Sequence, residues 1–334
     1  MHLKLYTIIK TWKLPVAMTI GVLLYFLVAA LPLPTAGEGM VNEESIFRIT
    51  SHVVQPCLIF LMLTLSFLKV SLHDMKPHRW HFTVLCVQSL LFIACSLAAY
   101  WLPEFCPVDG SGILGVDGAT LKILLEGAML CFVCPTATAS AVIVQKLGGS
   151  LSGIVTYIIL CNLMVSVLAP GFLTLVEPHH GLDFMTGLFL IMGKVFPLLL
   201  FPLFVSTIIR HYLPRLSSFM LRIPDLAFYL WLVALALAIC VTVRTIVESH
   251  IAMSVLMGLA VVSLAGCLLQ FWLGRRLGGL TGGQAFGQKN TVFVIWMGLV
   301  FLNPVTSVVG GFYSVWHNII NSWQLYQKGK KPIQ

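Results

Sequence analysis

Charged residues are scarce in this sequence. Asp, Glu, Lys and Arg make up only 10% of the 334 residues, whereas 58% are hydrophobic and the mean hydropathy is +0.95. A soluble domain of this length could not bury so much apolar surface in one core, so the composition predicts a polytopic membrane protein. The apolar runs are long and continuous, which favours helices over a transmembrane β-barrel. We therefore expect an all-α membrane fold.

The sequence also lacks the patterns that metal sites and enzymes need. Nine cysteines are scattered mostly through apolar runs, and only Cys131 and Cys134 have a spacing seen in metal sites. No second cysteine pair or nearby histidine completes such a site, so we interpret these cysteines as packing residues. No nucleophile, carboxylate pair or metal cluster occurs at useful spacing, and an intramembrane enzyme that uses His317 has little support. We expect neither enzymatic activity nor a cofactor.

Ten apolar segments are candidate membrane spans: 15–32, 53–71, 82–102, 122–146, 151–175, 184–209, 226–247, 251–273, 281–302 and 305–325. The first is too long for a signal peptide and has no small-residue cleavage pattern, so we interpret it as a span. An even number of spans puts both termini on one side. If that side is the cytoplasm, the outer segments hold only three basic residues, Arg48, Lys122 and Arg244, which is a strong positive-inside bias.

The same charge distribution indicates partners and location. The net charge of +8 comes mostly from the cytoplasmic rim, where it would face anionic lipid, so it implies no nucleic-acid partner. The short termini and the absence of a transit peptide favour the inner (plasma) membrane of a bacterial cell. We expect a multi-pass protein whose environment is the lipid bilayer and whose two termini are cytoplasmic.

The ten segments are expected to form one membrane domain over residues 1–334, divided into two repeats, 1–178 and 179–334. Five spans per repeat is an odd number, which forces the repeats into opposite orientations, as in inverted-repeat transporters. The fourth and ninth segments would then correspond, and both contain small and polar residues where a lipid-facing helix would be apolar. Such paired interruptions predict two broken helices that meet at a binding site near the bilayer midplane.

The fourth segment is interrupted at CPTATASAVIVQKLGG. Pro135 removes a backbone donor in mid-span, and the hydroxyls of Thr136, Thr138 and Ser140 follow it. A half-helix that begins there would present free N–H groups, which attract anions. The alternative is that these hydroxyls bond back to their own helix turn, which is common in membranes. The sequence does not choose between the two.

The ninth segment contains GQAFGQKNTVFVIWMG, residues 283–298, in which Lys289 is accompanied by Gln284, Gln288, Asn290 and Thr291. A charge at depth costs about 3 kcal/mol or more, so an ionisable residue inside a membrane indicates function. Snorkelling to the inner interface near Leu280 is the alternative, but roughly 12 Å of helix rise separates the two residues. The pattern favours a functional role for Lys289.

Other polar residues lie within apolar segments. Lys194 in the sixth segment either lines the same cavity or pairs with an acid such as Glu126, and the spacing does not choose between these. Gln88 is an isolated polar residue in the apolar third segment, and it either contacts a ligand or forms a hydrogen bond to a neighbouring helix. Four polar residues lie within about one helical turn of the tenth segment: His317, Asn318, Asn321 and Ser322. They either form a binding site in which His317 titrates or make hydrogen bonds to neighbouring helices.

Three stretches resemble the bile acid:sodium symporter family. PCLIFLMLTLSF is similar to that family's P-x-L-x-x-x-M-x-x-G-L run, and CPTATASAVIVQKLGG resembles its C-P-G-G-T-A-S-N crossover. GQKNTVFVIWMG and SVWHNIINS are similar to its G-x-Q-N and S-V-W-H-N segments. The family comprises ten-helix carriers of organic anions. The resemblance implies a panel of spans one, two, six and seven against a core of the other six, with spans four and nine crossing.

The sequence departs from that family where sodium would bind. The family's sodium ligands come from the crossover, from later hydroxyls and from an E-x-G-x-Q-N run. The corresponding positions here are Ala141 beside the retained Ser140, Ile154 and Ile158, and Ala285 and Lys289. A one-residue shift would place Gln284 and Gln288 in the run but would still supply no carboxylate. We therefore expect neither of the two sodium sites.

These observations predict a sodium-independent secondary transporter of an organic anion, either a small carboxylate or a bile-acid-like solute, that works by alternating access. Lys289 would replace the bound sodium, either permanently or by taking up a proton in each cycle, and in the second case protons would be a further partner. We expect substrate contacts from Thr138, Ser140, Asn290, Thr291, His317 and Asn318, and coupling from Lys289, Gln288 and Gln88. The rival hypothesis is a membrane sensor or scaffold with the same fold that binds a ligand without transporting it.

Overall fold

A computed structural model describes residues 13–31, 42–69, 75–106, 117–178, 183–223, 226–249 and 251–330. These parts of the chain are almost entirely helical and contain no strand, which confirms the all-α fold class. Six helical stretches are long and apolar enough to cross a membrane: Glu43–Leu68, Arg79–Phe105, Leu151–Val176, Phe184–Tyr212, Leu226–Glu248 and Met253–Gly287. Pro15–Ala30 and Thr291–Phe301 are shorter apolar helices.

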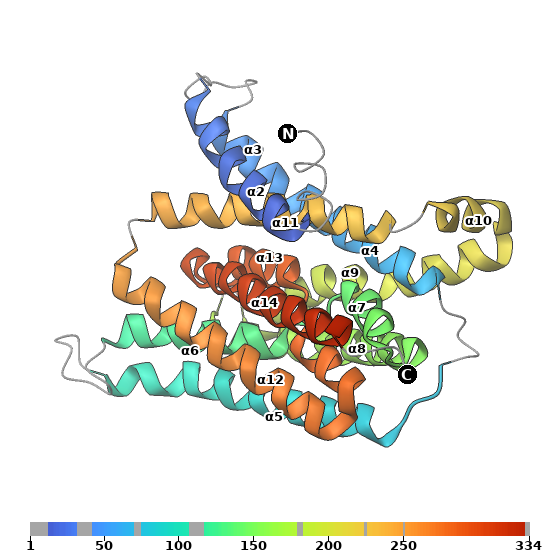
Figure 1. Cartoon of the computed structure of the whole chain (residues 1–334). Coiled ribbons are helices and arrows are strands. Elements are labelled where there is room, and N and C mark those ends of the chain that lie inside the picture. The colour runs from blue at the N-terminus through green and yellow to red at the C-terminus, as the bar shows by residue number, and fades with distance from the viewer. Residues whose placement is uncertain are drawn as a thin grey trace.

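The helices follow the predicted apolar segments (Figure 1). In the first half of the chain they are α2 (Lys13–Ala30), α3 (Glu43–Ile49), the π-helix η1 (Thr50–Val54), α4 (Gln55–Leu68), α5 (Arg79–Trp101), η3 (Leu102–Phe105), α6 (Gly118–Val133), α7 (Ala139–Leu147) and α8 (Leu151–Val176). In the second half they are α9 (Phe184–Tyr212), α10 (Pro214–Arg222), α11 (Leu226–Glu248), α12 (Met253–Gly287), α13 (Thr291–Phe301), η5 (Pro304–Ser307) and α14 (Val308–Lys330).

Polar residues just before the apolar runs determine where several helices begin. The Asp117 carboxylate accepts a hydrogen bond of 2.9 Å from the Thr120 backbone N–H and another of 2.9 Å from the Thr120 hydroxyl. These bonds stabilise the charged carboxylate and lower the pKa of Asp117. Asp183 caps α9 through Thr186 in the same way. Because Asp is a preferred N-cap residue, these two positions define the N-terminal ends of α6 and α9.

A glycine hairpin separates the eighth and ninth predicted segments. The structure assigns Met253–Gly287 to one helix, but Gly278 and Gly279 have non-helical angles and Gly279 has a φ of +63°. The chain reverses at this bend, so that a Cβ on Gly274 would collide with the carbonyl oxygen of Gly282. Only glycine permits both the positive φ and the close approach of the two backbones. The second arm of α12 leads into the predicted ninth segment.

The helices pack into two groups. In the first group α11 lies against α2 and α4, and α4 also contacts α9; in the second, α5, α6, α8, α12 and α14 contact one another. Figure 1 shows α2, α4 and α11 along one face of the molecule and α5, α6 and α12 along the opposite face. α8 of the second group also packs against α9 of the first. The division into a panel and a core that the resemblance implied stays a prediction.

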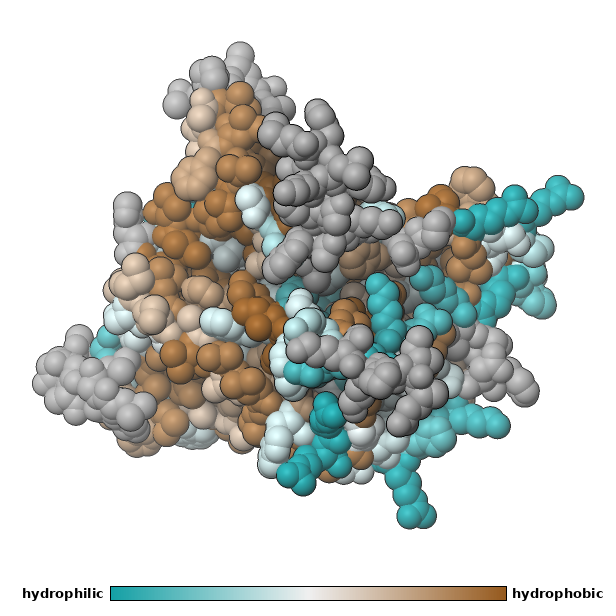
Figure 2. All heavy atoms as spheres, viewed as in Figure 1, coloured by the Kyte–Doolittle hydropathy of each residue, from teal (hydrophilic) through white to brown (hydrophobic). Residues whose placement is uncertain are grey.

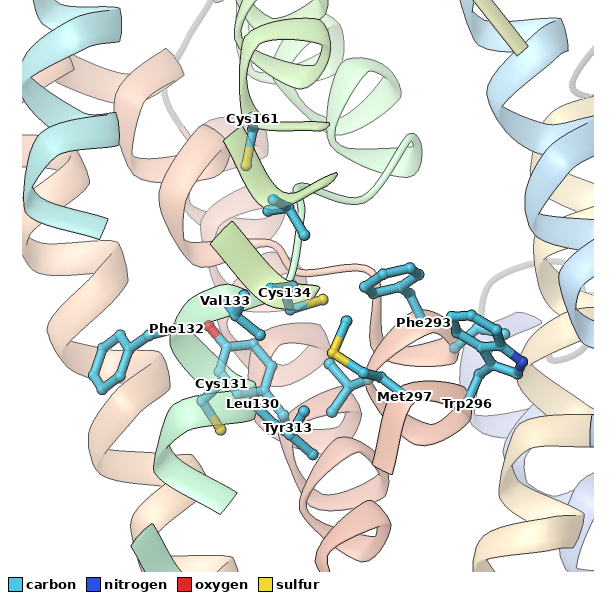
Figure 3. Packing of buried hydrophobic residues seen from close by; sticks show 14 of the residues in the cluster. Leu130, Cys131, Phe132, Val133, Cys134, Cys161, Phe293, Trp296, Met297 and Tyr313 are labelled. Carbon is cyan, nitrogen blue, oxygen red and sulfur yellow. The ribbon is translucent and has the colours of Figure 1, made fainter. Parts of the chain in front are cut away.

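The apolar core surrounds the interruption between α6 and α7. Leu130, Cys131 and Cys134 are buried there with Phe293 and Met297 of α13 (Figure 3). Both cysteines are thus packing residues, as the sequence predicted. Hydrophilic side chains gather at the end of the molecule that carries α10, while apolar side chains cover much of the remaining visible surface (Figure 2). One end of the visible face is therefore polar and much of the rest is apolar.

Candidate functional site: the crossing of two broken helices

The two interrupted segments meet, as the sequence predicted. Thr136, between α6 and α7, forms an antiparallel bridge with Lys289, between α12 and α13. The Ala137 N–H donates to the Gln288 carbonyl at 2.8 Å, and the Asn290 N–H donates to the Pro135 carbonyl at 2.9 Å. Each break thus satisfies backbone groups that the other break frees, which is necessary for non-helical backbone inside a membrane protein. We call this pairing the crossing.

Side chains from neighbouring helices hold the α6 side of the crossing. The Gln88 amide of α5 donates to the Cys134 carbonyl at 3.3 Å, and the Tyr157 hydroxyl of α8 donates to Gln88 Oε1 at 2.9 Å. The Thr136 hydroxyl donates to the Ala285 carbonyl at 2.5 Å. Gln88 therefore uses its amide to bond helices together, which favours the second of the two interpretations that the sequence allowed.

A similar arrangement holds the α12 side. The Tyr313 hydroxyl of α14 donates to the Gly287 carbonyl at 2.8 Å, and the Gln270 amide of α12 donates to the Cys131 carbonyl and to the Tyr313 oxygen, both at 3.2 Å. Sequence reasoning missed Gln270 and Tyr313. Gln270 is a buried polar residue in the apolar eighth segment, just as Gln88 is in the third. Comparing the two halves helix by helix would have pointed to it.

Lys289 is a buried cation at the centre of the crossing. Its side chain is only 1% exposed, so it does not snorkel to the surface. Among the described residues the ammonium has no hydrogen-bond acceptor, and it lies 4.9 Å from the centroid of the Phe286 ring. Among the described residues, no carboxylate forms an ion pair with it.

Several predicted site residues on the crossing segments are also buried without a partner. Burying a polar group unpaired costs free energy, so a cluster of such groups indicates a place where a ligand or water binds. The side-chain atoms without a hydrogen bond within the protein include Ser140 Oγ, both polar atoms of the Gln288 amide and Thr291 Oγ1. Asn290 differs, because its Oδ1 accepts a 3.3 Å bond from the Phe293 N–H and caps α13.

The sequence left open whether the polar turn of α14 forms a binding site or makes hydrogen bonds between helices. Its residues divide between these two roles. His317 is fully buried, its ring nitrogens have no partner, and its ring centroid lies 5.8 Å from that of Tyr313, which bonds to the crossing. Asn318 donates from Nδ2 to the Ser314 carbonyl of its own helix, at 2.8 Å. Asn321 accepts a 2.9 Å bond from Gln284 of α12 and so links helices. His317 therefore keeps its polar atoms free beside the crossing.

Two hollows flank α4 near its opposite ends. The first, of about 60 Å³, is bordered by Ser66 and Lys69 on one side and by Thr138 and other α7 residues on the other. The second, of about 540 Å³, is an open groove lined by Pro56 and Phe60 on one side and by residues of α9 and α13 on the other. The predicted ligand Thr138 is thus beside the smaller hollow.

Lys194 lines the larger groove together with His52 and Trp296. Its ammonium lies 5.6 Å from the centroid of the Phe301 ring. Pairing with Glu126, one of the two alternatives, is wrong. The carboxylate of Glu126 accepts a 2.8 Å bond from the Thr306 hydroxyl and lies 3.9 Å from the Lys122 ammonium. Lys194 therefore provides a second cation within the membrane-spanning region, in contact with the face of α13.

Neither a protein-family model nor a curated protein matches this chain. The resemblance to the bile acid:sodium symporter family stays a prediction that depends on the three stretches quoted above.

Proposed function

We propose that this protein is a secondary transporter that carries an organic anion by alternating access and without sodium. In this proposal the chain belongs to the bile acid:sodium symporter family and spans the bacterial inner membrane ten times, as two inverted repeats with cytoplasmic termini. It is not an enzyme. The proposal depends above all on the Lys289 ammonium, which is buried at the crossing without a counterion.

A buried cation without a partner favours binding of an anion. An uncompensated charge inside a protein is costly, and a bound carboxylate would supply the missing opposite charge. The N-termini of α7 and α13, at Ala139 and Thr291, begin at the crossing. Helix N-termini carry partial positive charge, so both half-helices add to the attraction for an anion.

The same geometry opposes sodium binding. Sodium is a hard cation and needs several oxygen ligands. Ala285, which replaces the family's glutamate, is fully buried and offers only its backbone carbonyl, which already accepts the Thr136 hydroxyl. A sodium ion beside Lys289 would also be repelled by the ammonium. We infer that Lys289 supplies permanently, or by a proton taken up in each cycle, the positive charge that sodium supplies elsewhere.

The hydrogen bonds around the crossing support two related halves. In each half, a glutamine of the third span and a tyrosine of the fifth span bond to each other, and at least one of the two also bonds to a backbone carbonyl beside a break. These pairs are Gln88 with Tyr157 and Gln270 with Tyr313. Repeats related by inversion would bring equivalent helices to the same midplane position.

The two hollows support alternating access. One separates α4 from α7 and the other separates α4 from α13, so each half-helix borders a hollow near a different end of α4. Pro56 and Ser66, which line the two hollows, are ten residues and about 15 Å of helix rise apart. A volume of about 540 Å³ is within the usual range for small-molecule sites. Either a small carboxylate or a bile-acid-like anion would fit this groove, with Lys194 as a second cation.

Uptake by proteoliposomes tests this function. A panel of labelled carboxylates would be offered to wild-type protein with and without a sodium gradient and with and without a pH gradient. We expect uptake without sodium, and a loss of roughly 10- to 150-fold in Lys289→Gln, because a charge-assisted bond contributes about 1.5–3 kcal/mol. Lys76→Gln, which changes an exposed lysine, should transport normally.

Each other outcome has a defined meaning. Uptake that requires sodium, or normal uptake by Lys289→Gln, would contradict the proposal. A carboxylate that binds without flux under every gradient would instead support a sensor or scaffold. If a pH gradient accelerates uptake by the wild type but not by Lys289→Gln, proton coupling would be assigned to Lys289.

A further inference from the structure

α10 is a short helix at the polar end of the molecule. It follows α9 directly and lies apart from the main bundle, where hydrophilic side chains gather (Figures 1 and 2). It contacts α9 and α4 through one side, on which Ser217 is buried and Met220 is half-buried. Its remaining residues, over Pro214–Arg222, are exposed. One face of α10 is therefore free to meet something outside the protein.

This free face carries two arginines at helical spacing. Arg215 and Arg222 are seven residues apart, which places them on the same side of the helix with about 10 Å of rise between them. With Pro214, Ser218 and Phe219 they border a shallow hollow of about 430 Å³. Within the described ranges, neither guanidinium forms an ion pair with an acid. Within this described part of the chain, the hollow thus presents two positive charges without a carboxylate partner.

Large apolar side chains surround these charges. Phe219 is 62% exposed, and Leu216 and Leu221 are 41% and 42% exposed. A helix that exposes both arginines and bulky apolar residues is typical of a segment in the interface of a bilayer, with its apolar groups near the acyl boundary. A soluble anion would pair with the arginines but would leave Phe219 and Leu216 in water. A phospholipid would satisfy both kinds of group.

We propose that α10 binds the headgroup of an anionic phospholipid. The guanidinium groups of Arg215 and Arg222 bind phosphate oxygens, since the arginine fork matches phosphate geometry. The Ser218 hydroxyl lies between them as a further donor, and Phe219 packs against the glycerol and acyl chains. Because α10 joins α9 to α11, the bound lipid holds this connection at the membrane surface. The inference requires only that the chain spans a membrane, so it is independent of the transported substrate.

Another basic pair of the chain provides a matched control. Arg276 already lies 5.7 Å from the centroid of the Trp272 ring, and the Cβ of Arg275 packs close to Gly283 at the α12 hairpin. The Arg276 guanidinium thus contacts a ring of the protein itself, and both arginines are exposed, as Arg215 and Arg222 are. If general basic charge were sufficient, Arg275→Gln/Arg276→Gln would weaken lipid binding as much as Arg215→Gln/Arg222→Gln.

Native mass spectrometry of the full chain in detergent tests the site. Phosphatidylglycerol, phosphatidylcholine and inorganic phosphate would be titrated separately, and the apparent Kd of the first bound lipid measured. Each basic residue near an anionic surface changes affinity about fivefold, so the double variant Arg215→Gln/Arg222→Gln should bind phosphatidylglycerol roughly 25-fold more weakly. The affinity of this double variant for phosphatidylcholine should change far less. The affinity of the control Arg275→Gln/Arg276→Gln for phosphatidylglycerol should also change far less. Arg215→Lys/Arg222→Lys, which keeps the charges, should retain most of the affinity.

Three results would overturn the inference. Unchanged phosphatidylglycerol affinity in the α10 double variant would show that the lipid binds elsewhere. An equal loss in the α12 control would show that only general charge matters. Competition by inorganic phosphate at concentrations comparable to those of the lipid would mean that the site takes a soluble anion. Thermal unfolding without added lipid should be the same for wild type and the lysine and glutamine variants, which excludes misfolding as the cause.

Discussion

Replacing Lys289 with methionine should stabilise the protein in the absence of substrate while abolishing anion binding. The side chain contributes no hydrogen bond to the crossing, whose bonds come from the backbone of residues 135, 137, 288 and 290. Methionine has a similar length and no charge, so it can occupy the same space without disturbing those bonds. If Lys289 binds a ligand, this substitution should therefore raise the free energy of unfolding. If Lys289 stabilises the fold, the substitution should lower it.

The size of the effect follows from the surroundings of the ammonium. A lysine at the centre of a membrane-spanning segment costs about 2.5–3.5 kcal/mol. The Phe286 ring, 4.9 Å away, returns about 1–2 kcal/mol as a desolvated cation–π contact. The difference predicts that Lys289→Met gains about 1–2 kcal/mol in the free energy of unfolding. For a chain of this length that gain corresponds to a rise of about 1.5–3 °C in Tm.

Thermal unfolding in detergent, with and without a carboxylate, measures both halves of this prediction. At a hundred times its Kd, a ligand stabilises the wild type by about 2.7 kcal/mol, whereas Lys289→Met should show no such shift. Lys76→Met makes the same chemical change at an exposed site and should stay within about 0.5 kcal/mol of wild type. A Tm for Lys289→Met below that of wild type, with Lys76→Met unchanged, would refute the reasoning, because the ammonium would then support the fold.

Two further predictions concern the frame of the site. Hydrogen bonds from Thr120 lower the folded-state pKa of Asp117, so its cap stabilises the protein above the unfolded pKa of about 3.9 and is lost as the pH falls through the folded value. Asp117→Ala should therefore lower the Tm at pH 7, and the difference from wild type should shrink at pH 3; an equal difference at both values would exclude this cause. Gly274→Ala should cost about 1–3 kcal/mol in denaturant unfolding because its Cβ collides with the Gly282 carbonyl. Gly171→Ala, with nothing within 4 Å of the added carbon, should instead be neutral or stabilising, and equal effects of the two would contradict the hairpin packing.

The helices and the two breaks could be predicted from the sequence because they depend on local properties. Long apolar runs require helices in a bilayer, and Pro135 cannot donate the bond that would continue α6. The glycine hairpin was visible as the gap between two apolar segments, although its close contact between Gly274 and Gly282 was not. α10 was missed altogether, because its mixture of arginines and apolar residues does not form an apolar run.

The partners of individual side chains could not be predicted, because they depend on how distant helices are rotated and offset. Spacing along the chain could not decide whether Lys194 faces Glu126, and the structure places it in a groove with His52 instead. It also could not reveal that Gln270 bonds to Tyr313, which lies 43 residues later. Hydropathy shows that a polar residue is unusual at its position but not which helix supplies its partner.

The crossing itself separates polar residues that hold the fold from those available to a ligand. Both kinds are buried, so burial alone does not distinguish them. Residues with a side-chain hydrogen bond that completes the backbone or caps a helix are Gln88, Gln270, Tyr313 and Asn290. Among the described residues, the predicted site residues on or beside the crossing whose side-chain polar atoms all lack a partner are Ser140, Gln288, Lys289, Thr291 and His317. Since a protein gains nothing in stability by burying unpaired polar groups, their position on or beside the crossing is the observation on which the proposed binding of an anion depends. Substituting members of the first set should therefore lower the free energy of unfolding, whereas substituting members of the second should change substrate affinity first.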